Sequence, residues 1–318
     1  MHVPPAIHLG INTCFAVKRW PETERWMSII ADDLGLQQCQ VSLDLFEPGL
    51  DPVMATGTAQ AVSKAAATAG VTLHSTFTGL AGYSGNLLLH PAPEARRAAL
   101  QWFERAIDLT GEMGAAGTGG FLGALSVADA ADPVQRHMRT GELKAAMDHL
   151  SDYASRVGLS FLLFENMAVP RELGSCIPEA HQLEAMGSEG PVPWTLCLDL
   201  GHPCALNTGS PSDDPLHWLS EDWMRTPVLQ IQQANRAGDF HWPFTPERNA
   251  EGLLFPAAVI ESLQANIPDG DLYLFFEIIH PAEYPDDGVL SDLRQSVDCW
   301  NTAIEQAAVA PNSGVTSG

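Results

Sequence analysis

The strongest constraint on the fold is a regular alternation of two hydrophobic patterns along the chain. Short runs of apolar and β-branched residues alternate with longer runs in which apolar residues recur every three or four positions. The first pattern predicts buried strands, and the second predicts amphipathic helices. No short turn of the kind that joins antiparallel strands links neighbouring runs. The pattern therefore predicts parallel strand–helix units along the whole chain.

The chain contains eight of these units. The predicted strands are residues 7–12, 38–43, 71–76, 115–119, 160–165, 195–199, 228–232 and 273–277. The predicted helices are residues 22–33, 52–69, 93–114, 133–157, 177–186, 213–224, 255–265 and 292–307. Prolines and glycines agree with these bounds. Pro93 and Pro133 fall in first helical turns, while Gly70 and Gly158 follow helix ends, where a left-handed conformation is favoured.

Eight strand–helix units in 318 residues predict an α/β fold, a closed (β/α)8 TIM barrel forming a single domain over residues 1–307. Residues 308–318 are small and polar and are expected to form a flexible tail. The alternative is an open, doubly wound sheet, which favours a glycine-rich turn after its first strand; residues 12–17 lack one. Gly117, Gly119 and Gly120 indicate close backbone packing at the end of the fourth strand instead.

One long segment, residues 234–252, shows neither pattern and is interpreted as an irregular loop. Loops of this length inside a domain are usually functional or disordered. Its aromatic residues, Trp242 and Phe244 among them, favour a functional loop.

Composition excludes several classes of partner. The chain has 16 Lys and Arg against 39 Asp and Glu, a net charge of −23, which disfavours binding to nucleic acid or to an anionic membrane surface. No apolar run approaches the roughly 18 residues of a membrane span. The first residues show no secretory signal, and the six cysteines form no CxxC pair. We therefore expect a cytoplasmic protein with reduced thiols.

Polar residues end four consecutive predicted strands. Glu165, Asp199 and Glu277 end the fifth, sixth and eighth, while the seventh carries Gln230 and Gln232. In a barrel these strand ends form one rim, where catalytic residues lie. Each acid taken alone could instead form a salt bridge or cap a helix. Three buried carboxylates together need a cation, and oxygen ligands favour Mn²⁺, Mg²⁺ or Co²⁺.

The segments around these acids resemble the xylose-isomerase-like barrel superfamily, which contains sugar isomerases, ketose 3-epimerases and an endonuclease branch. The resemblance covers residues 6–307. Residues 9–20, 74–80 and 241–245 further resemble the tetrulose-phosphate racemase and epimerase branch of bacterial erythritol catabolism. The segments that carry the superfamily resemblance are Phe164-Glu165-Asn166, Leu198-Asp199-Leu200-Gly201-His202 and Phe276-Glu277.

By this resemblance, Glu165, Asp199 and Glu277 are metal ligands, and Glu165 and Glu277 are also the acid and base. The fourth ligand, usually histidine, corresponds to Gln230, although Gln232 shares its strand face. The predicted substrate-binding residues are His74, His202, Arg236 and His241, together with Lys18 and Arg19, whose charge and predicted rim position suit a phosphate. For His74, His202 and His241 a purely structural role is the alternative.

The expected function is a metal-dependent ketose or ketose phosphate 3-epimerase or racemase on a short sugar such as tetrulose phosphate, acting through a metal-bound enediolate. One alternative is an aldose–ketose isomerase on the same barrel. A second is a metal-dependent endonuclease, in which Asp239 and His241 would add ligands, although the charge disfavours it. A third is a barrel that binds sugar without catalysis. A homo-oligomer is compatible with the sequence.

Overall fold

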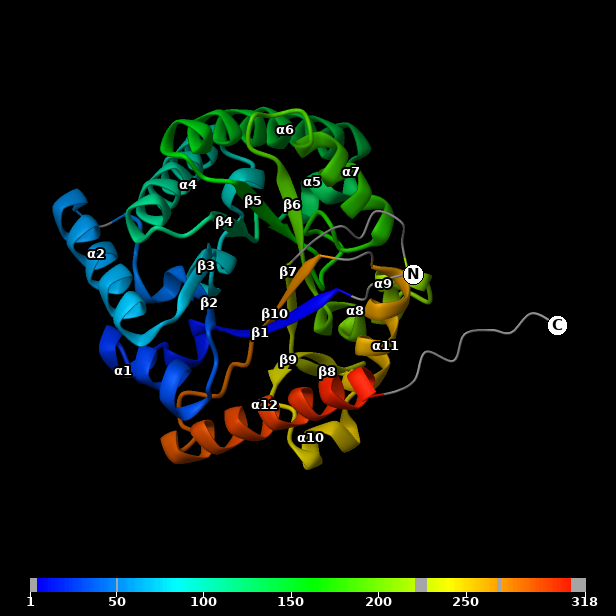
Figure 1. Ribbon diagram of the computed structural model, residues 1–318. Helices are drawn as coiled ribbons and strands as arrows, with labels where there is room; N and C mark the ends of the chain where they lie inside the picture. Colours follow the sequence, from blue (N-terminus) through cyan, green and yellow to red (C-terminus); the bar gives the residue numbers. More distant parts are fainter. Residues whose placement is uncertain (1–4, 50, 221–227, 268–269, 310–318) are drawn as a thin grey trace.

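Eight parallel strands close into one barrel in the computed structural model, and Figure 1 looks along the barrel axis. The structure describes residues 5–49, 51–220, 228–267 and 270–309. The strands follow the order β1-β10-β7-β6-β5-β4-β3-β2, so the last strand of the barrel pairs with the first. The barrel strands are β1 Ala6–Asn12, β2 Gln38–Ser42, β3 Thr72–Phe77, β4 Gly117–Gly120, β5 Phe161–Glu165, β6 Trp194–Asp199, β7 Val228–Ile231 and β10 Asp271–Phe276.

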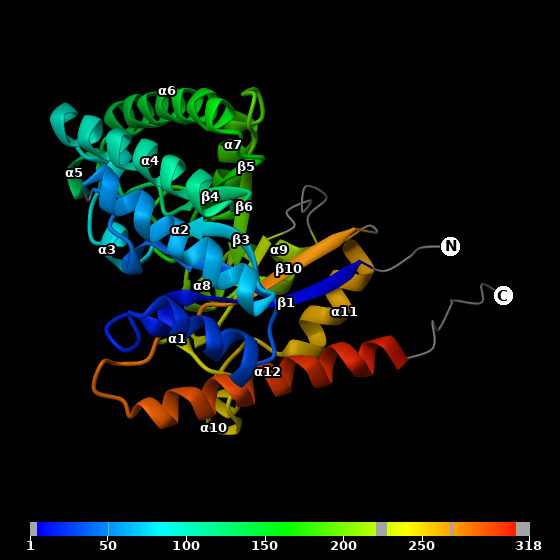
Figure 2. The same cartoon turned by 60° about the vertical axis from the view of Figure 1, so that its left-hand side comes forward.

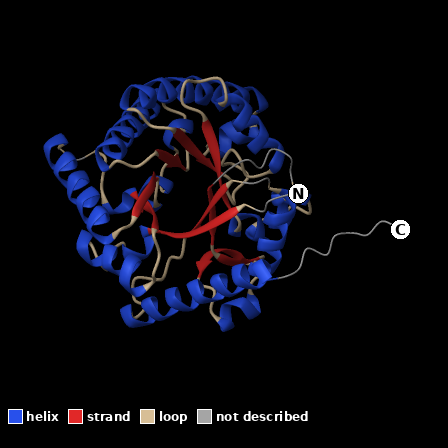
Figure 3. Cartoon of the chain, in the orientation of Figure 1, coloured by secondary structure: helices blue, strands red, loops and turns tan. Residues whose placement is uncertain are grey.

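Helices surround the barrel on its outside, as Figure 3 shows by colour. The helices are α1 Thr23–Ser28, α2 Pro52–Ala69, α3 Leu80–Tyr83, α4 Pro93–Met113, α5 Val127–Ala131, α6 Pro133–Val157, α7 Ile177–Gly187, α8 Gly201–Ala205, α9 Pro215–Leu219, α10 Pro246–Glu251, α11 Pro256–Asn266 and α12 Asp286–Val309. Figure 2 shows that the start of β1 and the end of α12 lie at the same end of the barrel. The other end carries the carboxyl termini of the strands.

The predicted (β/α)8 barrel is confirmed, and each predicted strand matches an observed one to within two residues at either end. The helices predicted at 52–69 and 133–157 match α2 and α6 exactly in their bounds. The tail expected at 308–318 lies, from residue 310 on, outside the described residues. All six cysteines are free thiols, as expected.

Three predicted helices differ from the structure. The helix predicted at 292–307 is longer, since α12 begins six residues earlier, at Asp286, and ends at Val309. The helix predicted at 22–33 is α1 followed by a π-helical turn, Ile29–Asp33. The helix predicted at 213–224 is only a 3₁₀ turn, Pro211–Asp213, followed by the short α9. Pro215 begins α9 because its fixed φ suits a first helical position, and Asp214 caps that helix. The end of that prediction, 221–224, lies outside the described residues.

The prediction of an irregular loop at 234–252 was wrong. Strands β8 Gln233–Asn235 and β9 Gly238–Trp242 form an antiparallel hairpin there, and α10 follows it. Two strands this short show no recognisable alternation in the sequence. The turn is stabilised by Asn235, whose Oδ1 accepts a hydrogen bond from the Ala237 N–H at 2.9 Å. The hairpin packs against α8 at the end of the barrel that carries the strand carboxyl termini.

The main hydrophobic core lies between the barrel and the helices, with Trp26, Trp218 and Trp300 fully buried in it. A second apolar cluster, which includes Phe77, Leu163 and Phe275, fills part of the barrel interior. Within the described parts of the chain, no helix combines the length and the apolar character that crossing a membrane requires.

Strand β4 depends on glycine. Gly119 has a φ of +147°, and a Cβ at this position would lie 2.0 Å from the carbonyl oxygen of Leu163 on β5. The backbone of β4 can therefore approach β5 only because residue 119 has no side chain. This agrees with the close backbone packing that the sequence predicts at the end of the fourth strand.

We predict that Gly119→Ala lowers the free energy of unfolding by about 2–4 kcal/mol, because both the backbone conformation and the clash with Leu163 oppose a side chain. Gly141→Ala is the matched control, since this exposed glycine of α6 has open space around it; alanine should stabilise the helix by up to about 1 kcal/mol. Urea denaturation measures both, and equal stabilities of the two variants would contradict the prediction.

Candidate active site

Three carboxylates meet at the carboxyl end of the barrel. Glu165 is the last residue of β5, Asp199 is the last of β6, and Glu277 directly follows β10. Their exposed fractions are only 6%, 0% and 7%. This arrangement follows from the parallel register, which brings the ends of these strands to one rim.

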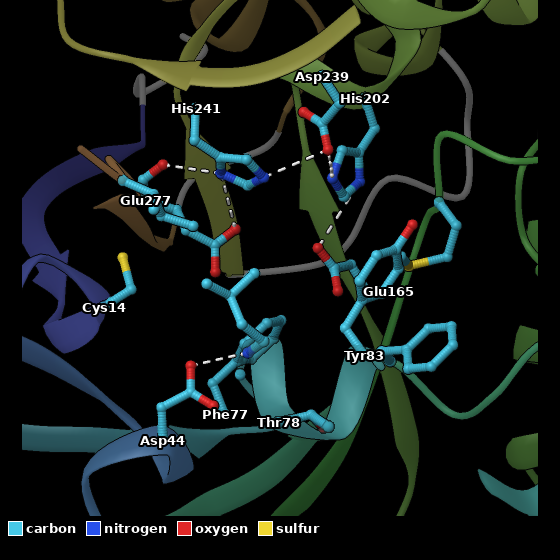
Figure 4. Close-up of a pocket in the computed structure, with 15 residues that line it drawn as sticks. Cys14, Asp44, Phe77, Thr78, Tyr83, Glu165, His202, Asp239, His241 and Glu277 are labelled. Atoms are coloured by element: carbon cyan, nitrogen blue, oxygen red, sulfur yellow. Dashed lines mark hydrogen bonds and ion pairs between the residues drawn. The ribbon is translucent and has the colours of Figure 1, made fainter. Parts of the chain in front are cut away.

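A cavity of about 210 Å³ opens at this rim (Figure 4). Glu165 and Glu277 approach it from two sides, with His241 and Asp239 between them in the view. The residues that line the cavity are Cys14, Asp44, Phe77, Thr78, Gly79, Leu80, Tyr83, Phe121, Glu165, Met167, His202, Asp239, His241, Glu277 and Ile279. Among these described lining residues there is no Lys or Arg.

Burial and mutual repulsion disfavour the charged forms of the two glutamates. Burial raises the pKa of Glu165 well above its usual range, and the charges of Glu277 and Asp199 add to this effect, while that of His202 opposes it. Burial likewise raises the pKa of Glu277 to about 8. The charge of His241 lowers this pKa, while that of Asp199 raises it further. A nearby cation would offset these effects and stabilise the charged forms of both glutamates.

Donor groups at the rim fit a divalent cation. Glu165, Asp199 and His202 offer ligand atoms within 4.8 Å of one another, and so do Asp199, His241 and Glu277. Gln230 pairs in register with Asp199 and is fully buried. Its Nε2 donates to Oε1 of Gln40 at 2.8 Å, while its own Oε1 is buried without a hydrogen-bond partner. Such an unpaired amide oxygen is costly to bury and is a suitable cation ligand.

Asn166 holds Asp199 and His202 in place. Its side chain donates to the carbonyl of Asp199 at 2.9 Å and accepts from the Asp199 N–H at 2.7 Å. The carbonyl oxygen of Asn166 lies 2.6 Å from Nδ1 of His202. Because a carbonyl can only accept, Nδ1 carries the proton and Nε2 of His202 faces the site. Sequence patterns give no role to Asn166 beyond its position next to Glu165.

The hairpin brings His241 and Asp239 into the site, and Gln232 links it to the barrel. The Nε2 group of Gln232 donates to Asp199 Oδ2 at 3.1 Å and to Asp239 Oδ1 at 2.8 Å, and its Oε1 accepts from the His241 N–H at 2.7 Å. Asp239 has no role in the sequence interpretation as an epimerase. The Asp-x-His spacing of residues 239–241 is the signal that points to it.

The imidazoles and Asp239 stabilise one another's charge. Burial lowers the pKa of His241, but Asp239 and Glu277 outweigh it and raise that pKa to about 10. Burial also lowers the pKa of His202, which Asp199, Asp239 and Glu165 raise well above its usual value. Burial raises the pKa of Asp239, but the charges of His202 and His241 lower it well below the usual range.

The structure does not bring the predicted basic residues to this cavity. Arg19 donates to the carbonyl oxygens of Tyr284 and Pro281 and pairs with Asp286, which fixes the segment before α12. Arg236 donates from Nη1 to backbone carbonyls at the end of α8 and beyond, including that of Leu206 at 2.7 Å. Lys18 is exposed and has a φ of +62°. A phosphate role for these three residues stays a prediction.

His74 lies inside the barrel and not among the residues of the cavity. Its ring packs against Phe161, Tyr273 and Phe275, with centroid distances of 5.3, 4.5 and 5.2 Å. Desolvation by burial lowers its pKa to about 4. These contacts support the structural alternative for His74.

Comparisons with known proteins find relatives among sugar epimerases and xylose-isomerase-like barrels. No family model matches the chain. A relative, the D-erythrulose 1-phosphate 3-epimerase of Brucella abortus, is 25% identical over 310 residues, which cover 95% of this chain and 98% of that protein. A solved structure described as a putative xylose isomerase from Rhodospirillum rubrum is 33% identical, with a TM-score of 0.87 and coverage of 93% of this chain and 99% of that one. A structure of L-ribulose 3-epimerase, 18% identical with a TM-score of 0.66 and coverage of 95% and 96%, shares the fold.

We predict that His74 makes stability depend on pH. Its pKa is about 4 in the folded protein against an ordinary value of 6.5, so the unfolded chain binds the proton more readily. Stability from this residue is therefore present above pH 6.5 and falls as the pH drops towards 4, by up to about 1.4 kcal/mol per pH unit. Urea denaturation of wild type and His74→Phe across this range should show a shallower slope for the variant. An identical slope would contradict the prediction.

Proposed function

Because this chain belongs to the xylose-isomerase-like superfamily of TIM barrels, we propose that it is a metal-dependent ketose 3-epimerase acting on a short ketose or its phosphate. Its relatives confirm the enzyme class expected from the sequence, an isomerase. The observation that carries the proposal is that Glu165 and Glu277, both buried, line one cavity of the rim, while the buried Asp199 offers a ligand atom within 4.8 Å of those of Glu165 and His202 and of those of His241 and Glu277.

Epimerisation needs a base on one face of the substrate and an acid on the other. The hydrogen on C3 of a ketose is weakly acidic because it neighbours the C2 carbonyl. Glu165 and Glu277 reach the cavity from different sides (Figure 4). One removes the proton from C3, and the other returns a proton to the opposite face, so the configuration at C3 inverts. Burial of both side chains favours a state with one protonated and one ionised carboxyl group.

Glu165, Asp199, Gln230 and Glu277 would hold the divalent metal. When bound, the metal would polarise the ketone and stabilise the negative charge that develops on the substrate oxygens. Gln230 suits the fourth position better than Gln232, because Oε1 of Gln230 has no partner. Both ends of the Gln232 amide are already engaged, with Asp199, Asp239 and the His241 N–H. Oxygen ligands of this kind favour Mn²⁺, Mg²⁺ or Co²⁺.

The size of the cavity supports a small substrate. Its volume of about 210 Å³ is below the roughly 300–1,000 Å³ of pockets that hold drug-sized molecules. The Brucella relative is named for a four-carbon ketose phosphate. We therefore propose tetruloses and their phosphates as the first substrates to test. The net charge of −23 argues against a nucleic-acid partner.

An aldose–ketose isomerase is the second candidate, because the similar Rhodospirillum structure is described as a putative xylose isomerase. The two reactions differ in their products, because isomerisation moves the carbonyl from C2 to C1, whereas epimerisation inverts C3 and leaves the carbonyl in place. NMR of the product from D- or L-erythrulose and from their phosphates distinguishes them.

Replacing either glutamate should abolish inversion. We expect Glu165→Gln and Glu277→Gln each to lower kcat by about 10²–10⁴-fold, because each removes one proton-transfer group. The measurements are inversion by chiral analysis and incorporation of solvent deuterium at C3 by NMR. Glu104→Gln on α4, which changes charge equally but lies outside the cavity, should leave both rates unchanged. Wild-type turnover in either active-site variant would overturn its assignment.

Metal removal gives an independent test. Dialysis of the protein against EDTA should abolish turnover, and Mn²⁺, Mg²⁺ or Co²⁺ should restore it, because the carboxylate oxygens prefer these cations. Full activity in protein shown by elemental analysis to be free of divalent metal would contradict the metal dependence.

A further inference from the structure

Three buried amide side chains form a continuous hydrogen-bonded chain inside the barrel. Nδ2 of Asn12 on β1 donates to Oε1 of Gln40 on β2 at 2.8 Å, and Nε2 of Gln230 on β7 donates to the same oxygen at 2.8 Å. All three residues are 1% exposed or less. We propose that Gln40 is a positioning residue that determines which end of the Gln230 amide, oxygen or nitrogen, is available to the metal. This inference rests on the proposed function, in which Oε1 of Gln230 is a metal ligand.

The contact between Gln40 and Gln230 crosses the interior of the barrel. Strands β2 and β7 are not neighbours, because β1 and β10 lie between them in the barrel (Figure 1). No backbone ladder between β2 and β7 therefore fixes one side chain relative to the other within the described barrel. A buried amide is costly unless its polar groups are hydrogen-bonded, so its bonding partners determine its orientation.

One backbone group sets the direction of the whole chain of bonds. The Cys14 N–H donates to Oδ1 of Asn12 at 2.9 Å, and a backbone N–H can only donate. The end of Asn12 that faces Gln40 is therefore its NH₂ group, which can also only donate. Gln40 must answer with its oxygen. The same Asn12 NH₂ group donates to Oε1 of Glu277 at 3.4 Å, so the chain of bonds also reaches one of the two proposed proton-transfer groups.

Gln40 passes this direction on to Gln230. Its Oε1 has two lone pairs, and it accepts one bond from Asn12 and one from Gln230. Its Nε2 donates to Oγ of Ser75 at 3.4 Å. A reversed Gln40 amide would place its NH₂ group against two other NH₂ groups. Gln230 is therefore held with Nε2 towards Gln40, and its Oε1 is left at the other end of the amide without a hydrogen-bond partner.

A glutamine ligand depends on such control more than a glutamate ligand does. The two ends of an amide have nearly the same shape, but only the oxygen can bind a divalent cation, because the NH₂ group offers donors alone. A glutamate at the same position would present an oxygen in either orientation. Metal affinity at Gln230 should therefore depend on Gln40, which touches the ligand and not the metal.

Metal affinity of the full-length chain tests this role. After EDTA treatment and dialysis, Mn²⁺ binding is measured by calorimetric titration. Gln40→Met has a similar length but no acceptor, so the Gln230 amide is free to turn its nitrogen towards the metal. We expect Mn²⁺ to bind roughly 10–100-fold more weakly, as for other residues that orient a ligand. Gln40→Glu keeps an oxygen towards Asn12 and Gln230 and should bind Mn²⁺ at least as tightly as wild type.

A double-mutant cycle separates orientation from packing. Because Gln230→Glu presents an oxygen either way, adding Gln40→Met in that background should change Mn²⁺ affinity by less than about threefold. Comparing affinities within each background cancels the effect of the added charge. Gln40→Ala repeats the cycle with a smaller side chain, so a folding defect in one variant does not decide the result. Thermal unfolding shows which variants are folded.

Gln38→Met is the matched control. Gln38 lies on the same strand two residues before Gln40, and its Oε1 is also buried without a hydrogen-bond partner. The described hydrogen bonds that link Asn12, Gln40 and Gln230 do not include it. This substitution makes the same change of side chain in the same strand and should leave Mn²⁺ affinity as in wild type.

Affinity and turnover decide separate questions. The positioning role is overturned if Gln40→Met binds Mn²⁺ as wild type does, if it loses as much affinity in the Gln230→Glu background, or if Gln40→Glu binds as weakly as Gln40→Met. A wild type that binds no Mn²⁺ also overturns it. Each of these results holds even if C3 inversion is observed. A loss confined to the background that retains Gln230 supports the role, even if no ketose is epimerised.

Discussion

The central constraint on this molecule is the burial of several carboxylates on one rim of an acidic chain. Glu165 and Asp199 end their strands and Glu277 directly follows β10, all three are buried, and burial raises the pKa of both glutamates. The surrounding residues respond to this charge. Asn166 fixes Asp199, the two imidazoles face the acids, and the unpaired oxygen of Gln230 adds a further ligand. The polar rim of the barrel therefore gathers donor groups that suit a cation.

The rim of the barrel consists of the ends of its strands and of the β8–β9 hairpin, which adds residues that the barrel strands do not supply. The hairpin is attached at three points: Gln232 links it to Asp199, the Ile279 N–H binds the His241 carbonyl, and Arg236 donates to carbonyls at the end of α8. These attachments turn a connecting segment into part of the site wall. They also explain why Arg236, a basic residue at the rim, contacts backbone and not the cavity.

The barrel could be predicted because it depends on the regular spacing of apolar residues along the chain. Its acidic rim could be predicted because it depends on which residues come at the ends of the strands. A strand that ends in Glu165 or Asp199 is visible in the sequence as an apolar run followed by an acid. The hairpin could not be predicted, since β8 and β9 are three and five residues long. The contacts of Arg19 and His74 depend on how loops and barrel layers meet in space, so charge or strand position alone could not place them.

The pairing of β1 with β10 determines when the site can exist during synthesis. Ile11 pairs with Phe276, and Asn12 beside it donates to Glu277 at 3.4 Å, so residues about 265 positions apart must meet. Until the last strand has left the ribosome, β1 and β7 each present an open edge and Glu277 is absent. A nascent chain can assemble the strands from β1 to β7 in order. The cavity lined by Glu165 and Glu277 is complete only at this closure, so the site can appear only after β10 has been synthesised.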